Sequence, residues 1–344
     1  MFSEFQIRPG RSSTPSRFPD ERGVGEVLAR GALEGAGQDS LYARLPLAHS
    51  LAWQGRGAEA DEVLAAVDPD TLSKDDLVAW ALPKTANQFW MRGDSAVART
   101  VLADVRDRVG AHPGADALDA LGATFALNAG ELAQSRRASD EVLARTGADD
   151  LAVAWAAATA TLAAARAGDL APVAELAARG LGTAHPGLLR FTIGLGQLTA
   201  ARLDCDAAGA ETLARHYLEF AGTQQPGRAI GDVLLADALI GRGDLTAAGA
   251  LLFQSAAALA DTGYSWGPLA QLMLVRTLGQ RGDYAQAQAE LPRAEDAHGL
   301  RSAMYTPELE LARAWTLAAG REMPGAIEAA RRAITAAGDS GQHG

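Results

Sequence analysis

A short turn recurs along this chain at a nearly constant interval. It is a glycine followed by aspartate or by another residue that starts a helix, and it occurs at Gly57-Ala58, Gly93-Asp94, Gly130-Glu131, Gly168-Asp169, Gly243-Asp244, Gly282-Asp283 and Gly320-Arg321. Successive turns lie 36, 37, 38, 75, 39 and 38 residues apart, and 75 is about two periods. A fixed period of this size is typical of arrays in which each unit packs only against its neighbours. The spacing therefore predicts a repeat protein.

The missing turn is expected near Cys205-Asp206, where a polar segment interrupts two stretches rich in Ala and Leu. One of the eight turns has then lost its glycine. At the others, the glycine is expected to end a helix in the left-handed conformation, which a β-carbon would strain. The residue after it can cap the next helix when it is aspartate.

Helical patterns flank each turn, so the predicted unit is helix, tight turn, helix and then a looser loop. Hydrophobic residues make up 48% of the chain and aromatic residues only 6%, and Ala and Leu, both strong helix formers, dominate the apolar share. We therefore predict an all-α protein, a right-handed α-solenoid of about eight helix pairs. The units are expected at about 43–72, 79–110, 115–147, 152–183, 190–222, 228–261, 267–299 and 305–337.

The seventh turn resembles the tetratricopeptide family. Its segment Gly282-Asp283-Tyr284-Ala285-Gln286-Ala287 is similar to the family's Gly-x-Tyr-x-x-Ala pattern, with Ala287 as the small residue at the close helix crossing. Ala210 fills the same position in the unit that lacks its glycine. The resemblance implies that the first helix of each unit lines a concave groove.

Counting back from the turns places seven side chains on that inner face: Trp80, Asn87, Trp90, Trp155, Arg166, Arg276 and Gln280. Trp53 and Phe89 are expected between the helices instead. Three tryptophan rings above an Ala-rich floor could stack on a sugar or hold an apolar peptide side chain. The alternative is that each ring fills space left by its Ala neighbours.

The two ends differ from the repeats. Residues 1–22 are polar and rich in Arg, Ser and Pro, and are expected to be disordered. Residues 23–34 resemble a second helix without its first helix, so the array is expected to span residues 23–337 with a leading half repeat. Residues 338–344 are expected to form a disordered tail without a polar capping helix. Both ends therefore look cut.

Residues 50–64 and 87–94 resemble the repeat region of large LuxR-type regulators related to the ATP- and maltotriose-dependent maltose activator. In that family a nucleotide-binding domain precedes the array and a helix-turn-helix domain follows it. This sequence has no Gly-x-x-x-x-Gly-Lys-Ser/Thr loop, since neither Lys74 nor Lys84 follows a glycine, and no basic recognition helix. The resemblance thus implies only the sensor segment of a transcriptional regulator.

No constellation for catalysis or metal binding is apparent. The six histidines include no pair three or four residues apart, and none stands in ligand spacing to the single cysteine, Cys205. Asp75-Asp76 and Asp149-Asp150 stand at predicted helix starts, where negative charge is favourable in any protein. We therefore predict no enzyme activity, no metal and no cofactor, and we interpret Cys205 as a turn residue.

The net charge of −11 argues against direct binding of nucleic acid, which needs clustered basic residues. No signal peptide or membrane span is evident, and one cysteine fits a reducing compartment, so a cytoplasmic location is expected. The predicted function is a non-catalytic sensor that recognises a small-molecule inducer or a protein partner on the concave face, as part of a regulator. A stand-alone scaffold for protein–protein interaction is the alternative.

Overall fold

A computed structural model describes residues 26–31, 40–184, 187–222, 225–260 and 264–344 of the chain. Throughout these ranges the regular secondary structure is helical, which confirms the all-α prediction. Residues 26–31 form a short helix at the position of the predicted half repeat. The predicted disordered segment 1–22 lies outside the described residues.

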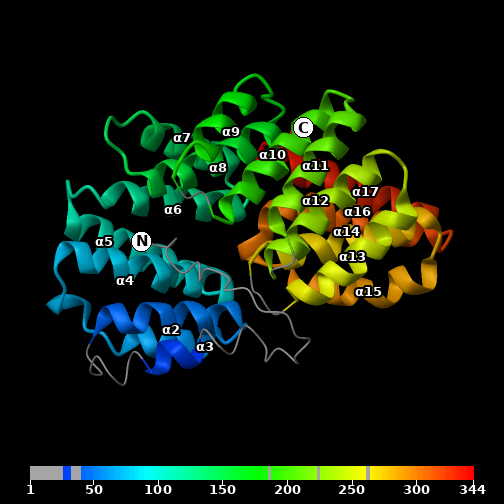
Figure 1. Ribbon diagram of the computed structural model, residues 1–344. Helices are drawn as coiled ribbons and strands as arrows, with labels where there is room; N and C mark the ends of the chain where they lie inside the picture. Colours follow the sequence, from blue (N-terminus) through cyan, green and yellow to red (C-terminus); the bar gives the residue numbers. More distant parts are fainter. Residues whose placement is uncertain (1–25, 32–39, 185–186, 223–224, 261–263) are drawn as a thin grey trace, which may run out of the picture.

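Eight helix pairs follow in chain order (Figure 1). They are α2 (Leu41–Trp53) with α3 (Gly57–Ala65), α4 (Lys74–Ala86) with α5 (Ser95–Val109), α6 (Ala115–Asn128) with α7 (Leu132–Leu143), and α8 (Asp150–Ala167) with α9 (Val173–Leu181). The second half holds α10 (Leu189–Leu203) with α11 (Ala207–Ala221), α12 (Gly227–Gly241) with α13 (Leu245–Leu259), α14 (Trp266–Arg281) with α15 (Tyr284–Ala297), and α16 (Thr306–Ala319) with α17 (Met323–Ser340). Three short elements complete the described chain: the 3₁₀ turns η1 (Pro69–Thr71) and η3 (Leu300–Tyr305), and the π-helical turn η2 (Asn87–Met91), which prolongs α4. We refer to the pairs as units 1 to 8, and together they confirm the predicted α-solenoid.

One residue in each pair has left-handed backbone and turns the chain from the first helix into the second. These residues are Gly55, Gly93, Gly130, Gly168, Cys205, Gly243, Gly282 and Arg321, with φ between 61° and 83°. In seven of the turns the following residue donates its N–H to the carbonyl five residues earlier, as Asp169 does to Ala164 at 3.0 Å. This bond satisfies one of the free carbonyls at the helix end.

Two of the predicted turn glycines have a different role. Gly57 begins α3, and a Cβ there would lie 2.6 Å from the Cβ of Met91. Gly320 has a φ of −76°, and a Cβ there would lie 2.6 Å from the ring of Tyr284. The prediction was wrong at these positions, because both glycines allow close packing between helices. Turns at Gly55 and Arg321 make the repeat more regular, with left-handed residues 37 to 39 apart.

The helices pack closely because small residues stand at their crossings. Ala287 and Ala210 are buried, as expected for that position in the repeat. Helices α8 and α10 approach so closely that a Cβ on Gly196 would lie 2.9 Å from the carbonyl carbon of Thr161. Close approach of backbones lets an Ala-rich core reach a high packing density with few large side chains.

The array curves until its two arms touch. Figure 1 shows α2–α5 on one side and α13–α17 on the other, with α8–α11 between them. Arg301 donates from Nη1 to the carbonyl oxygen of Trp90 at 2.6 Å, and the Trp90 ring lies 5.5 Å from the ring of Tyr264. The inner face is therefore a contact surface between units that are far apart in sequence.

The predicted disordered tail is instead part of the fold. Helix α17 continues to Ser340, and Gln342 is buried. The backbone N–H groups of His343 and Gly344 donate to the carbonyl oxygen of Arg166. The prediction for residues 338–344 was wrong because these partners lie four units away in the array, where a local sequence pattern does not reveal them.

Candidate functional site

The structure places two of the predicted groove tryptophans in the core. Trp80 is 6% exposed and donates from Nε1 to the carbonyl oxygen of Leu64 at 2.9 Å. Trp90 is also 6% exposed and packs edge-on against Phe89 and Phe125. Both rings therefore belong to the packed core, and the immediate neighbours of Trp90 are other aromatic rings. Trp155 is partly buried against the same hydrophobic core.

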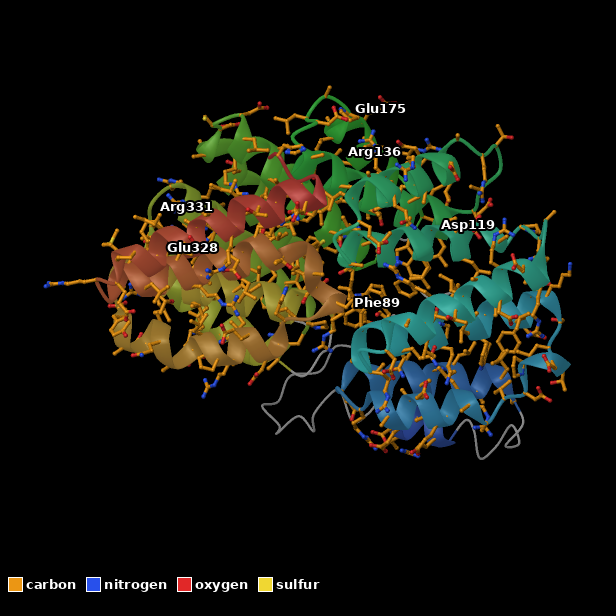
Figure 2. The ribbon with its side chains drawn as sticks, turned by 180° about the vertical axis from the view of Figure 1, so that it is seen from behind. Phe89, Asp119, Arg136, Glu175, Glu328 and Arg331 are labelled. Atoms are coloured by element: carbon orange, nitrogen blue, oxygen red, sulfur yellow. The ribbon has the colours of Figure 1, made fainter. Side chains whose placement is uncertain are left out.

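Asn87 and Phe89 lie in the π-helical turn η2. Asn87 is buried and donates from Nδ2 to the carbonyl oxygen of Gly57 at 2.9 Å, so it ties the two helices of neighbouring units together. Phe89 is fully buried and stacks on Phe125 at 4.3 Å, which confirms its predicted packing position. Figure 2 shows Phe89 close to the junction between the N-terminal and the C-terminal arm.

Five charged side chains gather on the inner face, one from the first helix of each of units 4 to 8. They are Arg166 on α8, Arg202 on α10, Asp237 on α12, Arg276 on α14 and Glu308 on α16, and we call them the inner-face charge cluster. Arg166 Nη2 lies 2.6 Å from Glu308 Oε1, and Arg202 Nη1 lies 3.1 Å from Asp237 Oδ1. These two ion pairs involve both carboxylates of the cluster, so the third guanidinium has no carboxylate partner within it.

Arg276 is that third guanidinium. Among the described residues it forms no hydrogen bond and no ion pair, and its Nε is buried without a partner. Burial lowers the pKa of Arg276, against the opposing influence of Asp237. For Arg166, burial acts in the same direction, but the neighbouring carboxylate of Glu308 brings the pKa above its ordinary value. The cluster therefore holds two partly buried arginines, of which Arg166 is paired and Arg276 is unpaired among the described residues.

Two acceptors near Arg276 also lack partners. Gln280 lies one turn further along α14, and its Oε1 is buried without a hydrogen bond from any described residue. The Oε2 of Glu308 is in the same state. An unpaired buried charge is costly, and unpaired polar atoms add to that cost. A ligand that brings an anionic group to Arg276 and a donor to the acceptors would relieve it.

Sequence reasoning found part of this site. The structure brings Arg166 and Arg276 into one cluster, with Gln280 adjacent on the same helix, and leaves the tryptophans out of it. Arg202, Asp237 and Glu308 were missed. A charged residue within an otherwise apolar first helix was the available signal, as at Asp237 in the buried run Val233 to Leu239.

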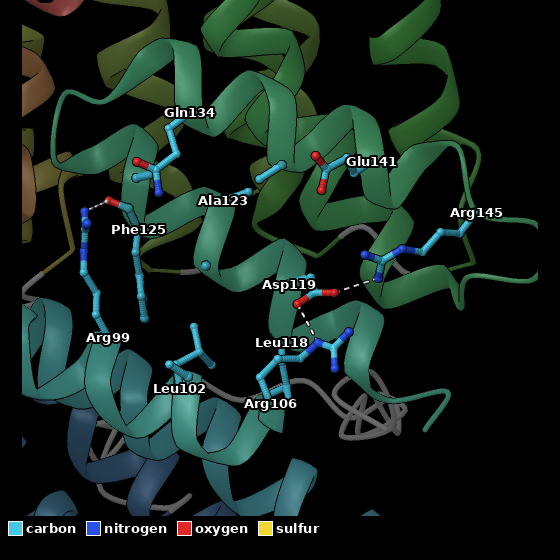
Figure 3. Close-up of a pocket in the computed structure, with 14 residues that line it drawn as sticks. Arg99, Leu102, Arg106, Leu118, Asp119, Ala123, Phe125, Gln134, Glu141 and Arg145 are labelled. Carbon is cyan, nitrogen blue, oxygen red and sulfur yellow. Dashed lines mark hydrogen bonds and ion pairs between the residues drawn. The ribbon is translucent and has the colours of Figure 1, made fainter. Parts of the chain in front are cut away.

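A second candidate is a pocket of about 370 Å³ that lies over α6 between the second helices α5 and α7 (Figure 3). Its floor is apolar and includes Leu102, Leu118 and Phe125. Its rim carries Arg106 and Arg145, among other polar side chains. Asp119 accepts from both arginines at 2.7 Å, so these cations are already paired. We call this hollow the α5–α7 pocket.

The carboxylate pairs have structural roles at helix starts. Asp149 accepts from the N–H of Ala152 at 2.7 Å and caps α8. Asp76 accepts hydrogen bonds from the hydroxyls of Tyr42 and Ser73, both at 2.7 Å, which lower its pKa. Cys205 is exposed and holds the left-handed turn of unit 5, as predicted for a turn residue.

The part of the chain that the structure describes contains no cluster of three or more His, Cys, Asp or Glu that could hold a metal ion. None of its helices is long and apolar enough to cross a membrane.

Comparison with known proteins identifies the fold. No protein-family model matches the sequence, and no curated protein matches it. The chain is similar to the crystal structure of Rap protein complexed with Competence and Sporulation Factor, with a TM-score of 0.57 and 10% identity over 88% of this chain and 99% of that chain. A monomeric mutant of IFIT1 with Gppp-AAAA gives a TM-score of 0.42 and 14% identity over 93% of this chain and 72% of that chain. The fold shared with the Rap protein places the chain among the all-α solenoids.

Proposed function

We propose that the chain is a non-catalytic binding module whose inner face recognises an anionic group on a small-molecule inducer or a protein partner. Arg276 carries the proposal, because it is a partly buried guanidinium whose Nε is buried without a partner among the described residues. A guanidinium offers several donors in a plane and binds carboxylate or phosphate in two-point contact. The solved Rap protein, a solenoid of similar extent, holds another factor, which supports a recognition role for this fold.

A thermal-shift screen with small carboxylates, phosphates and acidic peptides tests the inner face. A ligand that binds the folded state raises the unfolding midpoint of wild type. The same ligand is expected to have no effect on Arg276→Met, and an unreduced effect on the control Arg331→Met, whose side chain is 73% exposed on α17. Equal stabilisation of Arg276→Met and wild type would remove the assignment.

We further propose that the array is the sensor segment of a transcriptional regulator. The similarity of residues 50–64 and 87–94 to the LuxR-type regulators supports this role. The observation that decides it is the coding sequence on either side. A phosphate-binding loop upstream and a helix-turn-helix downstream are expected in the same reading frame, and two unrelated flanking genes would argue against a regulator.

A stand-alone interaction scaffold is the second candidate, and the α5–α7 pocket favours it. An apolar hollow with a polar rim is the usual setting for an anchoring side chain of a partner. Gly122 lines the pocket, and a Cβ there would meet only Leu102, at 3.5 Å. Gly122→Leu is therefore expected to fill the hollow and remove partner capture in a pull-down. Gly241→Leu, at a helical position with no described atom within 4 Å of a Cβ, is the matched control.

A further inference from the structure

Residues 341–344 join unit 8 to unit 4. The N–H groups of His343 and Gly344 both donate to the carbonyl oxygen of Arg166, at 3.1 and 3.0 Å. That carbonyl lies in the last turn of α8, where the helix itself supplies no donor. The segment thus satisfies a helix end that belongs to another part of the array.

Gln342 makes the side-chain contacts of this segment, and it uses both ends of its amide. Its Nε2 donates to the carbonyl oxygen of Met304 at 2.9 Å, and its Oε1 accepts from Nε of Arg166 at 2.6 Å. The side chain is buried between α8 and η3. A carboxylate in the same place would lack the donor, and an apolar side chain would lack both groups. The position therefore selects an amide.

The two positions after Gln342 differ in what they tolerate. His343 is exposed and contributes its backbone N–H. At Gly344 a Cβ would lie 2.5 Å from the carbonyl oxygen of Ala165 and 2.9 Å from Cδ1 of Leu203. A side chain at that position would force the backbone of α8 or the segment itself to move. The contact surface thus fits Gln, then any residue with a backbone N–H, and then Gly.

We propose that this surface is a peptide-binding site, which the chain fills with its own residues 341–344 and which a partner protein fills with a Gln-x-Gly segment. The surface consists of the last turn of α8 together with Met304, and we call it the α8–η3 seam. Every hydrogen bond from the segment to α8 and Met304 comes from its backbone or from one amide, so a partner can reproduce these bonds. Binding of the partner displaces residues 341–344 from the last turn of α8, and the partner's amide takes over the bond from Nε of Arg166.

A labelled peptide tests the seam in the full chain. The probe is Ser-Gly-Gln-His-Gly with a fluorophore on its N-terminus, read by fluorescence anisotropy. A short tether gives the chain's own segment an effective concentration in the millimolar range, so wild type binds the probe weakly. Gln342→Ala is expected to bind it at least about tenfold more tightly, because the competing amide is gone. His343→Ala keeps every contact of the segment and is expected to behave like wild type.

Two further probes examine the selectivity of the seam. A peptide with Glu in place of Gln, and one with Ala in place of the second Gly, are expected to bind poorly to Gln342→Ala. Gln342→Glu keeps an acceptor for Arg166 and serves as a second variant if the alanine form does not fold. Equal probe binding by wild type, Gln342→Ala and His343→Ala would overturn the proposal, as would no binding by a folded Gln342→Ala chain.

The seam does not depend on Arg276 or on an anionic ligand. The Arg276→Met chain is therefore expected to bind the peptide probe as wild type does. If wild type recognises no anion while Gln342→Ala binds the peptide probe, the proposed function alone is rejected. If wild type recognises anions while a folded Gln342→Ala chain does not bind the probe, only the seam is rejected.

Discussion

Arg166 on α8 and Glu308 on α16 form an ion pair at 2.6 Å, although they lie 142 residues apart in sequence. Their side chains are 11% and 18% exposed. The guanidinium of Arg166 also lies over the ring of Tyr305, at 5.2 Å from its centroid. In a simple solenoid each unit contacts only its neighbours. Here the pair joins units 4 and 8.

Replacing one partner of this pair leaves the other charge buried. We expect Arg166→Met to lower the free energy of unfolding by about 3 kcal/mol, because an uncompensated carboxylate is expensive in a partly dry site. Urea denaturation followed by circular dichroism measures the change. If the array behaves as a chain of independent units, the loss appears as a separate early transition of unit 8.

Arg331 and Glu328 supply the control for that experiment (Figure 2). Both lie on α17, where Arg331 Nη1 is 3.8 Å from Glu328 Oε2. The side chains of Arg331 and Glu328 are 73% and 60% exposed. Exposed pairs are screened by water and contribute little. Arg331→Met should leave the denaturation midpoint unchanged, and an equal loss in both variants would contradict the role of the Arg166 pair.

The repeat could be predicted from the sequence because its turns depend on local chemistry. A left-handed residue every 37 to 39 positions usually requires glycine, and glycine is visible in a sequence. The errors at Gly57 and Gly320 come from a second use of glycine, close approach between helices. That use depends on Met91 and Tyr284, which come from other helices. Local pattern does not separate the two uses.

The binding face was harder to predict because closure of the array is a tertiary event. Helical position places Trp90 on the inner face, but Tyr264 of the other arm packs against it. The same closure buries Arg166 against Glu308 and Gln342. Repeat position thus grouped Arg166 with Arg276, whereas the burial of Trp90 and Arg166 depends on contacts between units 2 to 4 and units 7 to 8.

The turn of unit 5 offers a direct measurement of backbone strain. Cys205 holds a φ of 61°, where a β-carbon is unfavourable. Cys205→Gly removes this strain, although the extra freedom that glycine gives the unfolded chain offsets part of the gain. The variant is therefore expected to raise the free energy of unfolding by up to about 1 kcal/mol.

Gly243→Ala is the inverse test, since its φ is 83° and no described atom lies within 4 Å of the added Cβ. A loss of about 1 kcal/mol is expected there. Opposite signs for both variants would reject the strain argument.

His298 predicts that the stability of the folded chain decreases in mild acid. Burial lowers its pKa below the ordinary 6.5, with smaller opposing influence from Glu308, and its ring bonds to Thr306 and Ser302 at 3.2 Å. At pH values between the folded and the unfolded pKa of His298, the unfolded chain binds more protons than the folded chain. The free energy of unfolding therefore decreases as the pH falls below about 6.5. We expect thermal unfolding midpoints to fall less steeply between about pH 7.5 and pH 5.5 in His298→Asn than in wild type. His216→Asn, on the exposed side of α11, should keep the wild-type slope.

Arg276 predicts a conflict between stability and recognition. A methionine fills a similar volume without a partly buried, unpaired charge, so Arg276→Met is expected to raise the free energy of unfolding by about 1 kcal/mol. A purely structural arginine would give the opposite sign, because its loss would remove contacts. Urea denaturation of wild type and Arg276→Met, without ligand, distinguishes the two. A more stable variant that has also lost the response to anions means that the chain retains this arginine for binding. A less stable variant means that Arg276 belongs to the framework of the solenoid, and the anion site must then lie elsewhere.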